Sequence, residues 1–323
     1  MKVSMWIHNQ LGWNEMVDLA KLADGDPAWS GIWFADHYMP NTSSGEPIEG
    51  DSHEAWSVLA GLAAVTDRVR LGPLVSPTSV HHPALLANRA ATIDHISGGR
   101  FVLGLGAGWQ VNEHRAYGIE LEPPKTRVDR FSESIQIVRS LLDNERTTFD
   151  GTHYTITDAP CEPHPVQEKL PIVVGTTGSR MMRITARWAD EWNAWGAPEL
   201  AARQRSRFVE ACEAVDTDVA TIATSSQALV FMSDDDSVLA EQRDKADLER
   251  SLVGTPARLV DELGAYSDAG FDEFILLSAT LGDSAAERRE GVRVMRPVWT
   301  LSPRASSPNT LYPNSYLRHS LRD

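Results

Sequence analysis

Short apolar runs alternate with longer segments of helical periodicity along almost the whole chain. The run Val3 to Ile7 precedes the amphipathic segment Trp13 to Ala23, and the same alternation continues to a closing helix over Ala285 to Met295. Several of the apolar runs are hydrophobic at consecutive positions, which is typical of strands buried on both faces of a parallel sheet. About eight such strands alternating with helices predict either a closed TIM (β/α)8 barrel or a doubly wound open sheet.

A hairpin and a C-terminal tail are expected to differ from this regular alternation. The Asp150-Gly151 turn signal inside Thr147 to Ile156 predicts a hairpin. The stretch Asp236 to Leu252 has helical spacing and predicts one helix. No composition shift marks a linker before about residue 300, so residues 1–300 are expected to form one domain. Residues 301–323 lack periodicity and predict an irregular C-terminal tail.

Composition and spacing exclude several classes of function. The net charge of −15 argues against a nucleic-acid or anionic-membrane surface. Cys161 and Cys212 are too few for a disulfide framework, which favours a cytoplasmic location. No signal peptide precedes the first strand, and no apolar run approaches the ~20 residues that span a bilayer. The adjacent pair His81-His82 is a poor chelate, and H-x-x-x-H and C-x-x-C patterns are absent, so no metal site is expected.

Glycines crowd at the carboxyl end of the expected strand Phe101 to Leu105. They stand at Gly104, Gly106 and Gly108, directly before Trp109. Glycine at such a place allows a flat cofactor or its phosphate to approach the backbone, or it eases a turn at the end of a barrel strand. The dinucleotide fingerprint G-x-G-x-x-G is not met, because Trp109 occupies its third glycine position and the motif does not follow the first strand.

A second glycine-containing turn follows the buried strand Pro171 to Val174. Its residues are Gly175, Thr176, Thr177, Gly178, Ser179 and Arg180. Free amides at a helix start, three hydroxyl groups and an arginine make a suitable phosphate cradle. An ordinary helix start capped by Ser179 is the alternative. Two glycine-rich turns in one barrel favour a cofactor that carries phosphate.

An ordered set of short motifs resembles the luciferase-like monooxygenase superfamily. The resemblance runs from residue 1 to about residue 298 and is most similar to the branch of probable oxidoreductases dependent on the deazaflavin coenzyme F420. The motifs include Trp33-Phe34-Ala35-Asp36-His37, Arg68-Val69-Arg70-Leu71-Gly72, Ile96-Ser97-Gly98-Gly99-Arg100, Leu103-Gly104-Leu105-Gly106-Ala107-Gly108-Trp109 and Ala189-Asp190-Glu191-Trp192-Asn193.

This resemblance implies a TIM barrel with insertion segments that binds coenzyme F420, or alternatively FMN, across its carboxyl end. The phosphate is expected at the turn Gly175 to Arg180, and the ring near strands two to four. The resemblance further implies a non-prolyl cis peptide, expected at the Pro73–Leu74 bond, and a homodimer. The cofactor-binding residues expected near the ring are Leu74, Val75, Ser76, Gly106, Ala107 and Gly108.

The resemblance also suggests which residues take part in catalysis. His37 closes the second strand, where it is expected to exchange a proton with substrate, and Asp36 is expected to orient the imidazole or cap the turn. His8, Trp109 and Trp192 are expected to line the substrate pocket. Sugar-phosphate dehydrogenases of this superfamily have an acidic residue where Trp109 stands, which argues against a sugar-phosphate substrate.

Three hypotheses follow from the sequence. The first is an F420-dependent oxidoreductase that exchanges a hydride with a small organic molecule. The second is an FMN-dependent monooxygenase that uses reduced flavin and oxygen on the same scaffold. The third is a flavin-binding relative without catalytic activity, against which His37, Arg180 and both glycine turns argue.

Overall fold

Strands and helices alternate as expected in the computed structural model, which describes residues 1–42, 45–282 and 284–300. The strands of the main sheet are β1 (Lys2–Ile7), β2 (Gly31–Phe34), β3 (Arg70–Pro73), β4 (Ser76–Pro77), β5 (Leu103–Gly106), β8 (Ile172–Gly175), β9 (Glu191–Trp195), β10 (Ala223–Met232), β11 (Ser251–Gly254) and β12 (Glu273–Leu277). The helices are α1 (Trp13–Gly25), α2 (Ala55–Val65), α3 (Pro83–Ser97), α4 (Val111–Ala116), α5 (Pro124–Asp143), α6 (Ser179–Trp188), α7 (Pro198–Glu213), α8 (Asp236–Lys245), α9 (Pro256–Asp268) and α10 (Ala285–Thr300).

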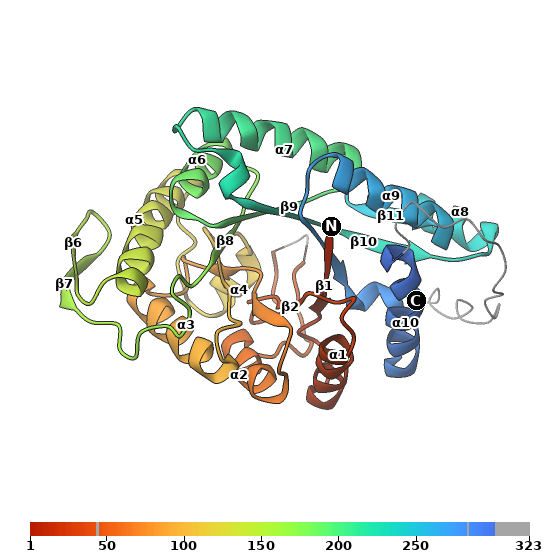
Figure 1. Cartoon of the computed structure of the whole chain (residues 1–323), viewed down its shortest axis with the longest axis horizontal. Coiled ribbons are helices and arrows are strands. Elements are labelled where there is room, and N and C mark those ends of the chain that lie inside the picture. The colour runs from red at the N-terminus through yellow and green to blue at the C-terminus, as the bar shows by residue number, and fades with distance from the viewer. Residues whose placement is uncertain (43–44, 283, 301–323) are drawn as a thin grey trace.

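The main sheet closes into a barrel. Its strands are neighbours in the order β3-β2-β1-β12-β10-β9-β8-β5-β4, with β11 beside β10, and the paired strands run parallel. A parallel bridge between Leu71 and Phe101 joins β3 to the segment before β5, so the two ends of the order meet. Figure 1 shows the helices around these strands. The chain is therefore a TIM barrel and not an open sheet.

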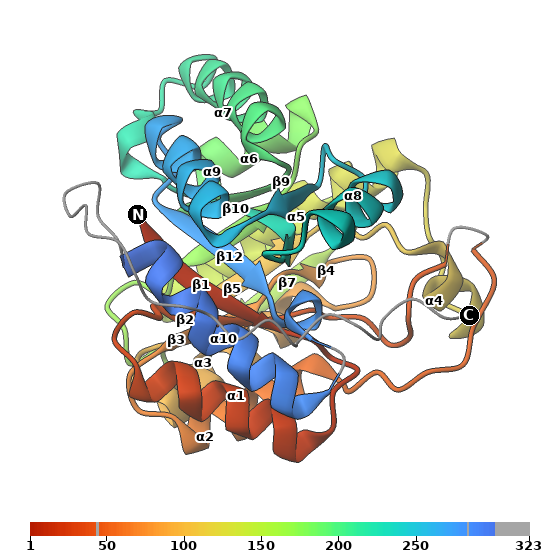
Figure 2. The same ribbon diagram turned by 90° about the vertical axis from the view of Figure 1, so that its right-hand side faces the viewer.

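One expected element differs in the structure, and one further helix was not expected. The stretch expected as one helix from Asp236 to Leu252 divides, because α8 ends at Lys245 and Ser251–Gly254 pairs with β10 as β11. Periodicity alone does not separate a short apolar strand from the end of a helix. The helix α4 was not expected. In Figure 2 it lies beside the long connection that follows β2.

The expected hairpin is confirmed. Strands β6 (Thr147–Asp150) and β7 (Thr155–Ala159) pair antiparallel. Figure 1 shows this hairpin outside the barrel, beyond α5. The tail expected over residues 301–323 lies outside the described residues. Within the described part of the chain, no helix combines the length and apolar character that a bilayer span needs.

Local sequence signals explain where the helices begin and end, as α3 illustrates. Pro83 occupies its first turn, where the missing N–H costs no helical hydrogen bond. The helix ends at Gly98, which has a φ of 65° in the left-handed region that favours glycine. Between such helices and the sheet lies the larger of two hydrophobic clusters. The smaller cluster lies inside the barrel and contains Trp33, Leu74, Val102, Val173 and Ile275.

A charged cluster closes the amino end of the barrel. Arg70, Glu191 and Glu273 stand at the first residues of β3, β9 and β12, and the Arg70 guanidinium lies 2.7 Å from a carboxylate oxygen of each glutamate. It also lies over the Trp33 ring, 5.0 Å from the centroid. Burial would lower the pKa of Arg70, but the charges and hydrogen bonds of Glu273 and Glu191 raise it above its ordinary value. With this end closed, the carboxyl end is the side open to a ligand.

Replacing Arg70 with Met tests this cluster. The variant keeps a long apolar side chain but leaves Glu191 and Glu273 without their cation, so we expect the free energy of unfolding to fall by about 3–5 kcal/mol. Urea unfolding followed by circular dichroism measures the change. Lys245→Met is the control, because it breaks an exposed pair with Glu241 and should cost less than about 1 kcal/mol. Equal losses in the two variants would contradict the role of the cluster.

Candidate active site

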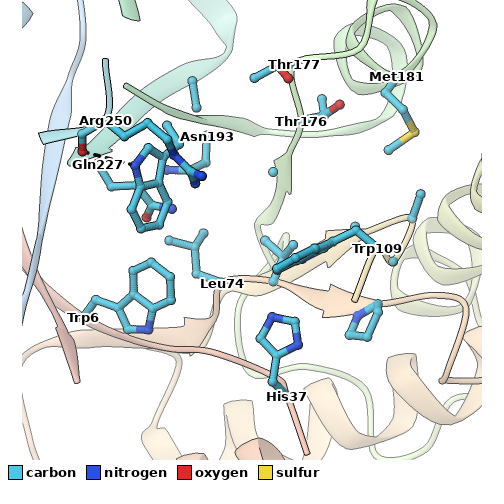
Figure 3. Close-up of a pocket in the computed structure, with 18 of the residues that line it drawn as sticks. Trp6, His37, Leu74, Trp109, Thr176, Thr177, Met181, Asn193, Gln227 and Arg250 are labelled. Atoms are coloured by element: carbon cyan, nitrogen blue, oxygen red, sulfur yellow. Dashed lines mark hydrogen bonds between the residues drawn. The ribbon is translucent and has the colours of Figure 1, made fainter. Parts of the chain in front are cut away.

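A cavity of about 390 Å³ opens at the carboxyl end of the barrel. Ligand pockets in proteins begin at about 300 Å³, so this cavity can hold a small molecule. Ten of the residues expected at the site line it, namely His37, Leu74, Val75, Gly106, Ala107, Gly108, Trp109, Gly175, Thr176 and Thr177. The lining also contains residues that the sequence did not single out, among them Trp6, Glu113, Asn193, Trp195, Gln227 and Arg250. Figure 3 shows this cavity.

The two glycine-rich turns lie side by side at the rim of the cavity. Strands β5 and β8 are neighbours, with Leu103 paired to Ile172 and Leu105 to Val174, and the turns follow the carboxyl ends of these strands. Gly106 to Gly108 and Gly175 to Thr177 therefore line one cavity, although about 70 residues separate them in the chain.

The glycines of these strands make room for the segment between β3 and β4. A Cβ atom at Gly104 would overlap the carbonyl oxygen of Pro73, and one at Gly106 would lie 2.7 Å from Val75 Cγ2. A Cβ atom at Gly175 would lie 3.3 Å from both methyl groups of Val75. These glycines were expected to admit a ligand, but their first effect is to admit Val75. This close packing places Leu74 and Val75 in the wall of the cavity.

The non-prolyl cis peptide lies in this same segment. It is the Leu74–Val75 bond, one residue later than the Pro73–Leu74 bond that the sequence predicted. Pro73 is the last residue of β3, and its neighbour Leu74 still donates its N–H to the carbonyl of Phe34 on β2 at 2.8 Å. The parallel ladder therefore continues through Leu74, and the chain departs from it only after that residue.

His37 and Glu113 form a hydrogen-bonded pair at the cavity wall. The Nδ1 atom of His37 lies 2.9 Å from Glu113 Oε1, and Glu113 Oε2 accepts a hydrogen bond from the Tyr38 N–H at 2.9 Å. Because a carboxylate only accepts, Nδ1 carries the proton and Nε2 of the neutral ring keeps a free lone pair. Figure 3 shows the His37 ring pointing into the cavity, and the Trp109 ring meets it edge to face at 5.5 Å.

Sequence reasoning missed Glu113. It lies on α4, whose six residues are too few to show helical periodicity, within the polar stretch Asn112 to His114 that looks like surface. All three side chains are buried. Hydrogen bonds fix α4 against the segment after β2. The side-chain amide of Asn112 donates to the carbonyl of Pro40, and that of Gln110, just before α4, donates to the carbonyl of Met39.

Asp36 lies outside the cavity lining, and its carboxylate is hydrogen-bonded to groups other than the neighbouring His37 ring. Its carboxylate accepts hydrogen bonds from Ser76 Oγ at 2.5 Å, His81 Nε2 at 2.9 Å and Trp56 Nε1 at 3.1 Å. Burial would raise the pKa of this carboxyl, but the hydrogen bond and charge of His81, together with Ser76 and Trp56, bring it below its ordinary value. The orienting role expected of Asp36 is filled by Glu113, and Asp36 instead ties β2 to the segment around Ser76.

Several other residues expected at the site lie outside the cavity lining. They are His8, Ser76, Gly178, Ser179, Arg180 and Trp192. Trp192 is fully buried and stacks on Phe208 at 4.4 Å. Its side chain points away from the cavity because residues alternate along β9, so that Asn193 and Trp195 face the cavity instead. Arg180 forms an ion pair with Asp129 on the surface.

Gly106→Ala tests the packing around Val75. The new methyl group would lie 2.7 Å from Val75 Cγ2, so we expect the free energy of unfolding to fall by about 1–3 kcal/mol. Gly264→Ala is the control, because this exposed glycine inside α9 has open space at its Cβ position and should gain about 0.5–1 kcal/mol. Urea unfolding measures both changes. A Gly106→Ala protein as stable as the parent would show that Val75 does not require this glycine.

Comparison with known proteins gives consistent similarities. The model of the luciferase-like monooxygenase family matches residues 1–250. The F420-dependent glucose-6-phosphate dehydrogenase of Microbacterium testaceum is 34% identical over 182 residues, which are 56% of this chain and 52% of that protein. The 5,10-methylenetetrahydromethanopterin reductase of Archaeoglobus fulgidus is 28% identical over 275 residues, 83% of this chain and 75% of that protein. The chain spans about half the length of the curated glucose-6-phosphate dehydrogenases that it matches.

Solved structures share the fold. An F420-dependent secondary alcohol dehydrogenase in complex with an F420-acetone adduct superimposes with a TM-score of 0.78 at 18% identity, covering 93% of this chain and 99% of that one. The monooxygenase RslO1 from Streptomyces bottropensis superimposes with a TM-score of 0.76 at 21% identity, again covering 93% and 99%. At these identities the likeness is one of architecture.

Proposed function

The chain belongs to the luciferase-like monooxygenase family, and we propose that it is an oxidoreductase that transfers a hydride between coenzyme F420 and a small organic molecule. The observation that carries this proposal is the His37–Glu113 pair, which faces the same cavity as both glycine-rich turns. Relatives named as F420-dependent glucose-6-phosphate dehydrogenases support the choice of coenzyme.

The residues of the cavity suit such a coenzyme. The lining combines apolar side chains, among them Leu74 and Val75, with the hydroxyl-bearing pair Thr176 and Thr177 directly after Gly175, a composition that suits a ring and a phosphate group. Leu74, Val75 and the turn Gly106 to Gly108 would hold the ring, and the turn Gly175 to Thr177 would hold the phosphate.

When bound, the coenzyme supplies two-electron hydride chemistry. The protein's own contribution would be proton transfer and the exclusion of water. Glu113 fixes the tautomer of His37, so that Nε2 is the atom that accepts a proton from substrate, or returns it when the reaction runs in the other direction. Trp109 packs edge to face on the His37 ring, and Leu74 and Trp109 give the cavity apolar walls beside it.

Titration with two coenzymes tests the proposal. We expect the purified protein to bind F420 with a dissociation constant below about 1 μM and FMN at least about 100-fold more weakly, as followed by the fluorescence of each coenzyme. Tight binding of FMN with no binding of F420 would contradict the proposal and favour the flavin-dependent monooxygenase. Binding of neither would remove the support for a redox cofactor in this cavity.

Replacement of His37 and Glu113 tests the catalytic assignment. We expect His37→Ala to lower the rate of F420-dependent turnover by about 10²–10⁴-fold while its affinity for F420 stays within about two-fold. Glu113→Gln is expected to retain part of the rate but to shift its pH profile, because the amide can present its N–H to Nδ1 and favour the wrong tautomer. An unchanged rate and pH profile in His37→Ala would favour a relative without catalytic activity.

A homodimer and a cytoplasmic location form part of the same proposal. The free, buried thiols of Cys161 and Cys212 support a reducing compartment. The dimer rests on the family resemblance.

A further inference from the structure

Two arginines lie over tryptophan rings at opposite ends of the barrel, and they differ in their charge partners. Arg70 at the amino end lies over Trp33 and binds two glutamates. Arg250 at the carboxyl end lies over Trp195, with its guanidinium carbon 4.7 Å from the ring centroid. Among the described residues, no carboxylate forms an ion pair with Arg250. Its sequence neighbour Glu249 pairs with Arg203 instead.

The position of Arg250 is fixed by its own backbone. Its carbonyl oxygen accepts hydrogen bonds from the Leu229 N–H at 3.0 Å and from Trp195 Nε1 at 3.4 Å. Its N–H donates to the carbonyl of Asp247 at 2.9 Å. Trp195 in turn packs edge to face on Trp6 at 5.5 Å. Arg250 is exposed, and its guanidinium lies over the indole face of Trp195 at the cavity rim, an arrangement that leaves its N–H groups available to a ligand.

Gln227 adds a second polar group to this end of the cavity. Its side chain is only 7% exposed and lines the cavity, and its Oε1 atom has no hydrogen-bond partner. Figure 3 shows Arg250, Gln227 and Trp6 on one side of the cavity and Thr177 and Trp109 on the opposite side.

We propose that Arg250 binds the carboxylate of the substrate, so that the enzyme acts on small organic monocarboxylates with an apolar body. This inference rests on the proposed function, because it assigns the substrate of that same site. In the described lining of the cavity, Arg250 is the one lysine or arginine, so its single positive charge matches a monoanion better than a phosphate dianion. Trp6 and Trp195 provide the apolar surface beside it.

The glycine-rich turn after β8 lies across the cavity from Arg250. This placement indicates that the carboxylate bound by Arg250 belongs to the substrate and not to the coenzyme. The turn with Thr176 and Thr177 stands on β8, whereas Arg250 precedes β11 on the far side of β9 and β10. A coenzyme whose phosphate binds at Thr177 would leave the Arg250 end of the cavity to the molecule with which it reacts. The carboxylate would then be held while His37 handles the proton.

Calorimetric titration of the F420-loaded protein tests this assignment. The probes are benzoate and hexanoate, with benzamide and hexanamide as neutral isosteres. We expect the parent protein to bind the carboxylates at least about ten-fold more tightly than the amides. A ratio of this order corresponds to one hydrogen bond between charged groups. Arg250→Gln should remove this preference, and Arg250→Lys should retain part of it because the charge remains without the planar fork.

Matched controls separate the carboxylate site from general effects. Arg203→Gln removes an exposed arginine that lies outside the cavity lining, and it should leave the preference unchanged. The affinity of Arg250→Gln for F420 should stay within about two-fold of the parent value. Equal binding of carboxylates and amides by the parent protein, or an unchanged preference in Arg250→Gln, would overturn the proposal.

Two further titrations distinguish the other sources of an anion. Glucose 6-phosphate bound more tightly than either carboxylate would overturn the monocarboxylate assignment. A second outcome would assign Arg250 to the coenzyme instead. In it, Arg250→Gln loses affinity for F420 but keeps its affinity for the ribityl deazaflavin, which lacks the phosphate and everything beyond it. If the parent protein binds no F420, the proposed function fails, but the same carboxylate titration of the coenzyme-free protein still decides whether Arg250 selects carboxylates.

Discussion

The packing of Val75 among three glycines is the constraint on which the candidate site depends. Gly104, Gly106 and Gly175 stand on two adjacent strands, and each has a Cβ position that Val75 or its neighbour Pro73 already occupies or crowds. Because these strands carry no side chain there, the segment after β3 can press against them. That close approach sets Leu74 and Val75 in the cavity wall, beside the two turns that the pairing of β5 with β8 brings to the same rim.

The two ends of the barrel use similar residue types for different purposes. At the amino end, the charge of Arg70 is matched by Glu191 and Glu273, and the cluster closes the barrel. At the carboxyl end, Glu113 is the charged partner of His37, whereas Arg250 has no carboxylate partner in the described residues. A matched charge stabilises the fold, while an unmatched charge in a cavity is available to bind a ligand. This contrast explains why one end is structural and the other can carry chemistry.

Consecutive apolar runs predicted strands buried on both faces, which left a barrel and an open sheet as alternatives, and the family resemblance selected the barrel that the structure has. The sequence also predicted that His37 and both glycine turns lie at one cavity, since the carboxyl ends of parallel strands meet there. It failed at Trp192, because the motif does not reveal which face of β9 a residue occupies. Glu113 and Arg250 escaped notice for other reasons. Glu113 stands in a polar stretch that resembles surface, although packing buries its side chain at the cavity. Arg250 is exposed, and its place at the rim depends on the pairing of β11 with β10, which the sequence did not reveal.

The central claim is that this rim binds a deazaflavin between the two glycine turns and His37. A crystal structure of the protein grown with F420 tests it most directly. The account predicts electron density for the deazaflavin ring against Leu74 and Val75, with the phosphate at Thr176 and Thr177. Density for the coenzyme at any other place, or a rim filled by the protein's own side chains, would contradict it.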